Sequence, residues 1–232
     1  MKIIQQGDKF NVHNYDVLTG DSIKIKGGKH GSLLPNTIRC IISGPSNVGK
    51  TNVVFNLIVN PKGLKFNNVY LFSKSLSQPK YQLLEKILSD VKEVNFFKFN
   101  SSDHIMQPSE ALPHSVFIFD DVSNEKHNVI KSYFAMGRHY HIDSFYIGQT
   151  YSKIPKQLLR DNVNLIILFK QDDTNLKHIY NDHVGCDMTF AQFKEICGKA
   201  WDNVYGFLVI DKDSDKQKGR YRVQFDQFVL IS

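Results

Sequence analysis

The stretch TIRCIIS-GPSNVGKT-NVVFNLIV, from Thr37 to Val59, decides how the rest of the chain is interpreted. Residues 37–43 are a β-branched, apolar run, which predicts a buried strand. Residues 44–51 match the pattern of glycine, any four residues, then Gly-Lys-Ser/Thr, and residues 51–59 predict a helix that ends near Asn60-Pro61. A strand, a glycine-containing loop and a helix in this order are the context in which that pattern forms a P-loop.

The residue types in this loop suit the binding of phosphate groups. Backbone N–H groups must wrap the phosphate oxygens, and Gly49 keeps that approach clear of a side chain. The positive end of the helix dipole adds attraction for an anion. Lys50 is expected to reach the β- and γ-phosphates, and the Thr51 hydroxyl to bind Mg²⁺. We therefore expect ATP and Mg²⁺ to bind at Gly44, Pro45, Ser46, Asn47, Val48, Gly49, Lys50 and Thr51.

A pair of carboxylates follows another buried run, residues 116–119 (VFIF). P-loop enzymes need an acidic residue at the end of a nearby strand to organise Mg²⁺. Asp120 is predicted to hold Mg²⁺, mainly through water, and Asp121 to orient and polarise the attacking water. The alternative for Asp121 is a purely structural role as the cap of the following helix. A glutamate is the commoner residue for activating water.

Strands alternate with helices along the whole chain from Thr37. Further strands are predicted at residues 68–73, 94–99, 115–120, 144–149, 164–169, 204–210 and 221–231, and further helices at 79–90, 125–137, 155–161, 172–183 and 189–198. This alternation predicts an α/β fold with a mostly parallel central sheet, helices on both faces and a C-terminal β-hairpin. Residues 1–36 are interpreted as an irregular N-terminal extension and residues 37–232 as one P-loop ATPase domain.

The position of the strand Asn68–Ser73 points to a subclass of P-loop NTPase. It lies between the P-loop helix and Asp120 in the sequence. We interpret it as the strand that separates the two nucleotide motifs in the sheet, as in an additional-strand, RecA-like ATPase. A small-molecule kinase or a Ras-like GTPase fits less well, and the Asn-Lys-x-Asp motif that reads guanine is missing from the sequence.

Composition argues against a membrane-spanning or secreted protein. The 232 residues are 41% hydrophobic and carry a formal net charge of +6, which favours a polyanionic partner only weakly. The longest apolar runs are far shorter than the roughly 20 residues of a membrane span. The first residues, Met1–Ile4, turn polar too soon for a signal peptide. Three cysteines form no disulfide framework. We expect no membrane span and no secretion.

A glutamine and two arginines are further candidates for catalysis. Gln149 ends a predicted strand, where its amide can contact the γ-phosphate or the attacking water and act as a sensor; the alternative is a loop glutamine bonded to its own turn. An arginine from a neighbouring subunit stabilises the charge of a departing phosphate in many such enzymes. Among five arginines, Arg138 and Arg160 are the candidates, and either is alternatively a helix-end charge.

Together these segments resemble a known family. The sequences GPSNVGKT (44–51), FIFDD (117–121), FAMGRHYHIDSFYIGQT (134–150) and KIPKQLLRDNVNLIILFK (153–170) are similar to those of viral DNA-packaging ATPases of the FtsK–HerA superfamily, found in poxviruses, virophages and Polinton elements. The similarity spans roughly residues 37–169. The strand-terminal glutamine of the family maps to Gln149.

The resemblance implies a motor that drives double-stranded DNA into a preformed viral capsid. It implies a homo-oligomeric ring, such as a pentamer or hexamer, and a capsid or packaging-vertex protein as a partner. The expected location is the cytoplasm or viral factory of the infected cell, with association to the virion as a further option. Neither the N-terminal 36 residues nor the C-terminal hairpin is covered by a motif of the family.

Three other functions remain open at this stage. A helicase or helicase loader would share the ATPase core, but no separate helicase motif is present. A nucleotide kinase would need an arginine-rich lid, which five arginines do not readily supply. A scaffold that binds ATP without hydrolysing it is disfavoured by the intact Lys50, Asp120 and Asp121.

Surface residues for DNA are less defined. Lysines within residues 24–29 and 153–156 are candidates for DNA contact, although lysines of this kind are commonly just solvated surface. Trp201 and Tyr205 are expected in the core or on an edge strand rather than in a base-stacking platform.

Overall fold

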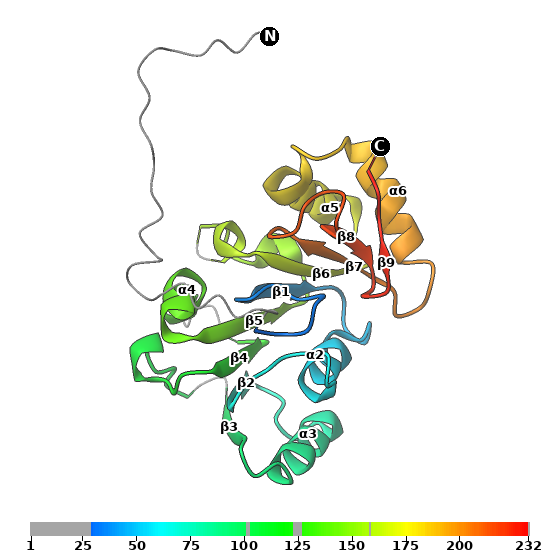
Figure 1. The fold of residues 1–232 in the computed structure, drawn as a ribbon. Coiled ribbons are helices and arrows are strands. Elements are labelled where there is room, and N and C mark those ends of the chain that lie inside the picture. The colour runs from blue at the N-terminus through cyan, green and yellow to red at the C-terminus, as the bar shows by residue number, and fades with distance from the viewer. Residues whose placement is uncertain (1–28, 101–102, 123–126, 158, 232) are drawn as a thin grey trace, which may run out of the picture.

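The strands of the protein form one mixed sheet. The computed structural model describes residues 29–100, 103–122, 127–157 and 159–231. Within these residues the strands follow the order β3-β2-β4-β5-β1-β6-β7-β8-β9 across the sheet (Figure 1). Their bounds are β1 Arg39–Ser43, β2 Asn68–Ser73, β3 Asn95–Asn100, β4 Ser115–Asp120, β5 Ile142–Gly148, β6 Leu165–Phe169, β7 Phe207–Asp211, β8 Tyr221–Val223 and β9 Gln227–Phe228.

The direction of the strands agrees with the predicted topology. The neighbours from β3 to β6 are parallel, and β7, β8 and β9 extend the sheet in antiparallel fashion. The mostly parallel sheet and the C-terminal hairpin are therefore confirmed. The final run, predicted as one strand over residues 221–231, forms two short strands instead. The chain reverses at residues 224–226, where Gln224 has a φ of 53°.

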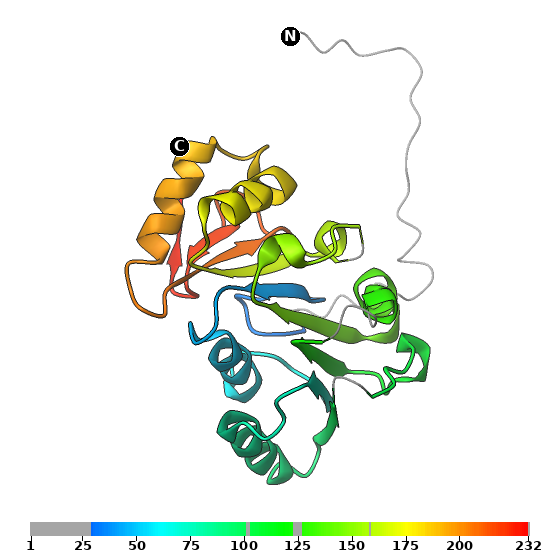
Figure 2. The ribbon, with the colours of Figure 1, turned by 180° about the vertical axis from the view of Figure 1, so that it is seen from behind.

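Helices cover both faces of this sheet, as predicted. Helices α2 and α3 pack on one face, and α4, α5 and α6 pack on the other (Figures 1 and 2). The helix bounds are α2 Lys50–Val59, α3 Pro79–Ser89, α4 His127–Met136, α5 Asp173–Ile179, continued by a π-helical turn at Tyr180–Val184, and α6 Phe190–Ala200. Short 3₁₀ turns lie at Pro108–Glu110, Gly137–Tyr140, Tyr151–Lys153 and Arg160–Asn162.

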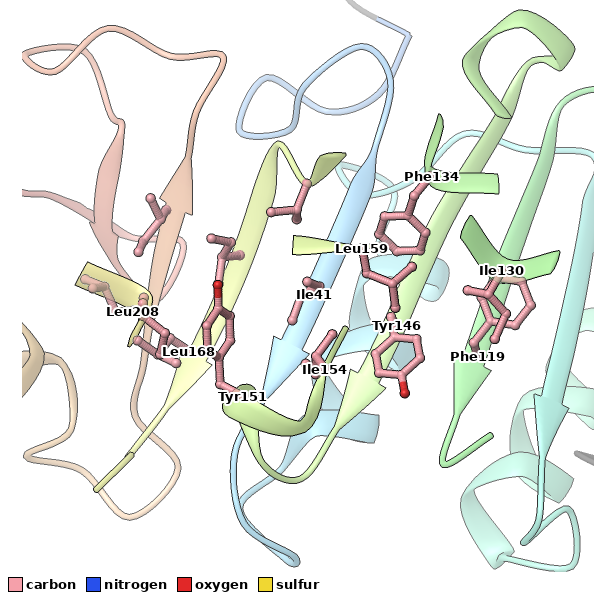
Figure 3. Packing of buried hydrophobic residues seen from close by; sticks show 14 of the residues in the cluster. Ile41, Phe119, Ile130, Phe134, Tyr146, Tyr151, Ile154, Leu159, Leu168 and Leu208 are labelled. Carbon is pink, nitrogen blue, oxygen red and sulfur yellow. The ribbon is translucent and has the colours of Figure 1, made fainter. Parts of the chain in front are cut away.

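The central strands are apolar on both faces because both faces are covered. In β4, Val116 and Ile118 join the core cluster under α2 and α3, whereas Phe117 and Phe119 join the cluster under α4. The ring of Phe117 lies 4.4 Å from that of Tyr133, a residue of α4. Figure 3 shows part of this second cluster, with side chains from α4 against β4 and β5. Each such buried side chain stabilises the fold by about 1.5–3 kcal/mol. Packing of this kind fixes where each strand ends.

The strand that separates the two nucleotide motifs is not the predicted one. Strand β5 lies between β1 and β4, and β2 lies on the far side of β4. The additional-strand arrangement is thus present, but Ile142–Gly148 supplies it and Asn68–Ser73 does not. Chain order does not decide this point, because each parallel crossover can place its strand on either side of the sheet already formed.

Some predicted helices have different bounds. The predicted helix 155–161 is absent from its described residues: residues 156, 157 and 159 form turns, and a 3₁₀ turn follows from Arg160. The side chains of Ile154 and Leu159 enter the core here, which holds the chain in turns (Figure 3). The predicted helix 125–137 begins in the structure at His127, and its first two residues lie outside the described residues.

The described part of the N-terminal extension is anchored to the sheet. The buried carboxylate of Asp143, in β5, accepts a hydrogen bond from the Lys29 ammonium at 2.6 Å and one from the Ile38 N–H at 2.8 Å. The Nε2 atom of His30 lies 3.1 Å from the same carboxylate. Residues 1–28 lie outside the described residues, so the boundary at Thr37 stays a prediction. In the described part of the chain, no helix combines the length and the apolar character needed to cross a bilayer.

Candidate functional site

The loop between β1 and α2 has the two glycine positions that its pattern requires. Gly49 has a φ of 107°, which side chains disfavour. A Cβ on Gly44 would lie 2.5 Å from the Cβ of Phe169, in the adjacent strand β6. The first glycine is therefore needed for close packing on β6, and the second for the turn into the helix. Between them, Pro45, Ser46 and Asn47 are exposed.

The start of α2 is open to an anion. Its N-cap, Gly49, makes no capping hydrogen bond from a side chain, and its first turn holds no acidic residue. The first N–H groups of a helix have no partner within the helix. They point out of a helix of ten residues, whose dipole is positive at this end. This segment therefore presents free donors beside the exposed loop.

Lys50 is held within the loop itself. Its ammonium donates hydrogen bonds of 2.6 Å to the carbonyl oxygens of Gly44 and Pro45. Burial lowers the pKa of Lys50, while Asp120 and Asp121 raise it. A partly desolvated ammonium near two carboxylates and against two carbonyls is a strong point charge in a region of low dielectric. The ammonium is thus tied to the first two residues of the loop.

Asp120 ends β4 beside α3. Its Oδ2 atom accepts a 2.5 Å hydrogen bond from the hydroxyl of Tyr81, and the Ser73 hydroxyl lies 3.5 Å away. Burial raises the pKa of Asp120, and the hydrogen bond from Tyr81 opposes that shift. The Thr51 hydroxyl also acts on the pKa of Tyr81 through a hydrogen bond. Thr51 and Asp120, predicted from separate motifs, are thus both neighbours of the Tyr81 hydroxyl.

This group of atoms suits Mg²⁺. Thr51, Ser73 and Asp120 offer only oxygen atoms, which hard divalent cations prefer. Mg²⁺ is usually held by one or two carboxylates together with substrate phosphates, rather than by a complete protein cage. Among the described residues, no cluster of three or more histidine, cysteine or acidic side chains suited to a metal occurs.

Asp121 has an unusual backbone conformation at the same edge. Its φ is 52°, in the left-handed region that aspartate tolerates better than most residues do. The side chain is exposed and lines a cavity of about 240 Å³ together with Gln149 and Lys153. Val122 follows directly and is buried in the core, and this packing holds the turn at Asp121 in place. Residues 123–126 lie outside the described residues, so the alternative role of Asp121 as a helix cap stays untested.

Gln149 lies between the P-loop and Asp121. It lines the cavity of Asp121, and it also lines a second cavity, of about 270 Å³, with Pro45 and Ser46. The register explains this position, because Ser43 pairs with Gly148 and Asp120 pairs with Ile147. The residues that follow β1, β4 and β5 therefore meet at one edge. The Gln149 amide lies within reach of both predicted halves of the site.

The two candidate arginines lie elsewhere, in different surroundings. Arg138 is exposed and lines a cavity of about 740 Å³ with Lys29, Lys65, His114 and His141. Several of these residues directly precede strands, so this cavity lies at the opposite edge of the sheet from the P-loop.

Arg160 is only 9% exposed, and its guanidinium donates a 2.7 Å hydrogen bond to Asp182 and lies over the Tyr151 ring. Neither Arg138 nor Arg160 contacts the P-loop of its own chain in the described structure.

The candidate lysines for DNA are only partly described. Lys153 is exposed beside Gln149, whereas Lys156 pairs with Asp182 at 3.1 Å. Lys29 is bonded to Asp143, and residues 24–28 lie outside the described residues.

Sequence reasoning missed Tyr81 altogether. Tyr81, Leu84 and Leu88 are the buried residues of α3, and this spacing resembles an ordinary apolar helix face. Nothing in the local sequence distinguishes a core tyrosine from one whose hydroxyl emerges beside a carboxylate. A weak signal was available, since a fully buried tyrosine needs a partner for its hydroxyl.

Comparison with known proteins bears on the fold. No protein-family model matches the chain, and no curated protein matches it either. Among solved structures, the genome packaging NTPase B204 from Sulfolobus turreted icosahedral virus 2 in complex with AMP is similar, with a TM-score of 0.54 and 14% identity over 86% of this chain and 100% of that chain.

Two further structures of this kind are similar. The AMPPCP complex of the same NTPase has a TM-score of 0.52 and 13% identity, covering 78% of this chain and 95% of that one. B204, the DNA-packaging ATPase from Sulfolobus turreted icosahedral virus, has a TM-score of 0.50 and 15% identity, covering 76% and 93%. At these identities the likeness concerns the fold. The chain has the α/β fold of these viral packaging NTPases.

Proposed function

We propose that the protein is an ATP-hydrolysing motor that moves double-stranded DNA into a viral capsid. One observation carries the proposal: three neighbouring strands, β1, β5 and β4, end at one edge of the sheet. The P-loop follows β1, Gln149 follows β5, and Asp120-Asp121 lie at the end of β4. The fold around them is shared with NTPases described as genome packaging enzymes. The geometry supports hydrolysis of a nucleoside triphosphate, and the shared fold supports packaging as its use.

Each residue of the edge has a proposed role. Lys50 and the free N–H groups of α2 bind the phosphates, and Thr51 and Asp120 hold Mg²⁺. Mg²⁺, when bound, neutralises charge on the β- and γ-oxygens. Asp121 orients the attacking water and accepts its proton, since the side chain lies in the exposed cavity and not in the core. Tyr81 positions the carboxylate of Asp120, and its hydrogen bond favours the ionised form against the effect of burial.

Gln149 is the proposed sensor of the γ-phosphate. It follows β5 directly and precedes the segment that carries Lys153 and the 3₁₀ turn Tyr151–Lys153. A change in what the amide contacts would therefore be passed to an exposed lysine a few residues away. This arrangement supports a proposed coupling between phosphate release and a contact of Lys153 with the DNA backbone.

A ring of subunits would complete the site. Arg138 lies at the sheet edge opposite its own P-loop, so it can serve a triphosphate only from a neighbouring subunit. Its exposure and the basic residues around it suit an approach to an anion. Arg160, buried in an ion pair with Asp182, would have to leave that pair first, so we favour Arg138. A pentamer or hexamer would place every Arg138 against the next P-loop.

The remaining partners follow from the proposed activity. A packaging motor must bind double-stranded DNA through its phosphates and dock on a capsid or packaging-vertex protein. It would act in the cytoplasm or viral factory of an infected cell. The formal net charge of +6 is compatible with a polyanionic substrate.

Hydrolysis that depends on DNA and on assembly is the first test. Steady-state ATP turnover should rise when long double-stranded DNA is added. Turnover per subunit should also increase with protein concentration, because active sites shared between subunits form only in the oligomer. Single-stranded DNA of equal nucleotide content is the control. Turnover that ignores DNA at every protein concentration contradicts the motor.

An isosteric substitution can test the proposed role of Asp121 in hydrolysis separately from ATP binding. Asp121→Asn should bind ATP with unchanged affinity and lose at least about 100-fold in turnover, because the amide cannot accept a proton from water. Asp90→Asn, at the exposed C-terminal end of α3, is the control and should leave turnover intact. Normal turnover in Asp121→Asn would show that another group activates the water.

The hydrogen bond from Tyr81 to Asp120 should affect the pH dependence of ATP turnover. Tyr81→Phe removes the hydrogen bond that lowers the pKa of Asp120, so this pKa rises further. Because Mg²⁺ binds the ionised carboxylate, the acid limb of the turnover profile should move to higher pH, and more Mg²⁺ should be needed near neutral pH. Tyr133→Phe, which removes a hydroxyl bonded to the Met106 carbonyl, is the control. Identical profiles for both variants would contradict the role of Tyr81.

Subunit mixing tests the arginine. Lys50→Ala and Arg138→Ala should each be inactive alone, since a supplied arginine is worth about 10³–10⁵ in rate. When the two are mixed, Lys50→Ala subunits can lend Arg138 to intact P-loops, so part of the turnover should return. Full activity of Arg138→Ala alone, or no recovery on mixing, would exclude Arg138 as the shared residue.

A further inference from the structure

The neighbours of β1 give the P-loop two chemically different sides. On one side β5 and β4 end in Gln149, Asp120 and Asp121, which are the groups proposed for the terminal phosphate. On the other side β6 ends in Phe169, and β7 begins opposite it, with Phe169 paired to Phe207. The nucleoside lies at the other end of the triphosphate from its terminal phosphate. If the terminal phosphate points toward β5 and β4, the side toward β6 and β7 is open to the nucleoside.

An exposed aromatic residue, Tyr205, lies on the side of β6 and β7. Tyr205 is 62% exposed, and its neighbour Val204 is 86% exposed. The Tyr205 ring lies close to the P-loop, with its Cδ1 atom 3.6 Å from where a Cβ on Gly49 would be. A ring atom of Phe169 lies 3.7 Å from the same point. Gly49 is the residue at which the loop turns into α2, so Tyr205 adjoins the phosphate site.

The position of Tyr205 is fixed by the backbone around it. The Gly206 N–H donates a 2.9 Å hydrogen bond to the Asn203 carbonyl, which closes a turn before β7. A Cβ on Gly206 would lie 2.1 Å from the Ala200 carbonyl, so only glycine permits this approach. The indole N–H of Trp201 donates a 3.0 Å hydrogen bond to the Leu168 carbonyl in β6. The turn is thereby tied to the strand beside the P-loop.

Tyr205 itself takes no part in this framework. No hydrogen bond or ring contact joins it to the rest of the described chain, and it lies outside β7. The expectation of a core or edge-strand residue is therefore wrong for Tyr205. Most of Tyr205 is open to solvent beside the phosphate-binding loop, where its ring is available to a ligand.

We propose that Tyr205, with Val204 beside it, is the platform on which the base of the bound nucleotide packs. The inference rests on the proposed ATP-binding function and adds the residue that holds the base. The base can stack on the Tyr205 ring, and the exposed side chain of Val204 extends the apolar surface around it. Stacking discriminates little among bases, so the site would prefer a purine for its larger area and would not read its edge.

The test compares a ligand that has a base with one that lacks it. The unmodified protein, Tyr205→Ala and Tyr205→Phe would be titrated by calorimetry with β,γ-methylene-ATP and with tripolyphosphate, each with Mg²⁺. Tyr205→Ala should bind the ATP analogue roughly 10- to 100-fold more weakly and tripolyphosphate equally well, the range expected for loss of one stacked ring. Tyr205→Phe should bind both ligands normally, since it keeps the ring.

Two further measurements sharpen the result. Tyr140→Ala, which removes a partly exposed tyrosine from the opposite edge, should leave both affinities unchanged. Trp201 is the single tryptophan, four residues from Tyr205, so its fluorescence should respond to the ATP analogue and much less to tripolyphosphate.

Equal weakening of both ligands in Tyr205→Ala, or none, would overturn the platform while the unmodified protein still binds ATP. If the unmodified protein bound neither ligand, the proposed function would fail and the platform with it.

Discussion

The parallel register of β4, β5 and β1 is the constraint on which the site depends. Parallel strands whose hydrogen bonds are in register end at one edge, and here Ser43 pairs with Gly148 and Ile147 with Asp120. A slip of one residue in β4 would turn Asp120 to the other face and bury it among apolar residues. Close packing on both faces opposes such a slip, because the shift would break contacts such as that of the Phe117 ring with Tyr133.

Local physics was enough to predict much of this fold from the sequence. Strand β2 begins and ends where its apolar run predicted, and the P-loop has the backbone that its glycines imply. Lateral strand order was beyond local reasoning, since β5 and not β2 separates the two motifs. The segment around Arg160 was mispredicted as a helix because tertiary contacts with Tyr151 and Asp182 overrule a proline that favours a helix start.

Two residues of the site region were invisible as functional groups in the sequence. Tyr81 has the spacing of a core residue, and only the meeting of α3 with the end of β4 reveals its bond to Asp120. Tyr205 lies in a run that predicts a strand, yet the turn closed by Asn203 and Gly206 ends before that strand starts. In both cases segments that are distant in the sequence lie close together in the fold, which local pattern cannot show.

The proposed motor depends on a hydrolytic site built from two subunits. Electron cryo-microscopy of Asp121→Asn protein assembled with ATP, Mg²⁺ and double-stranded DNA tests it most directly. We expect a ring with ATP at each interface, its γ-phosphate between Lys50 and Gln149 of one subunit and Arg138 of the next. ATP bound within isolated subunits, or interfaces that leave Arg138 far from any phosphate, would contradict it.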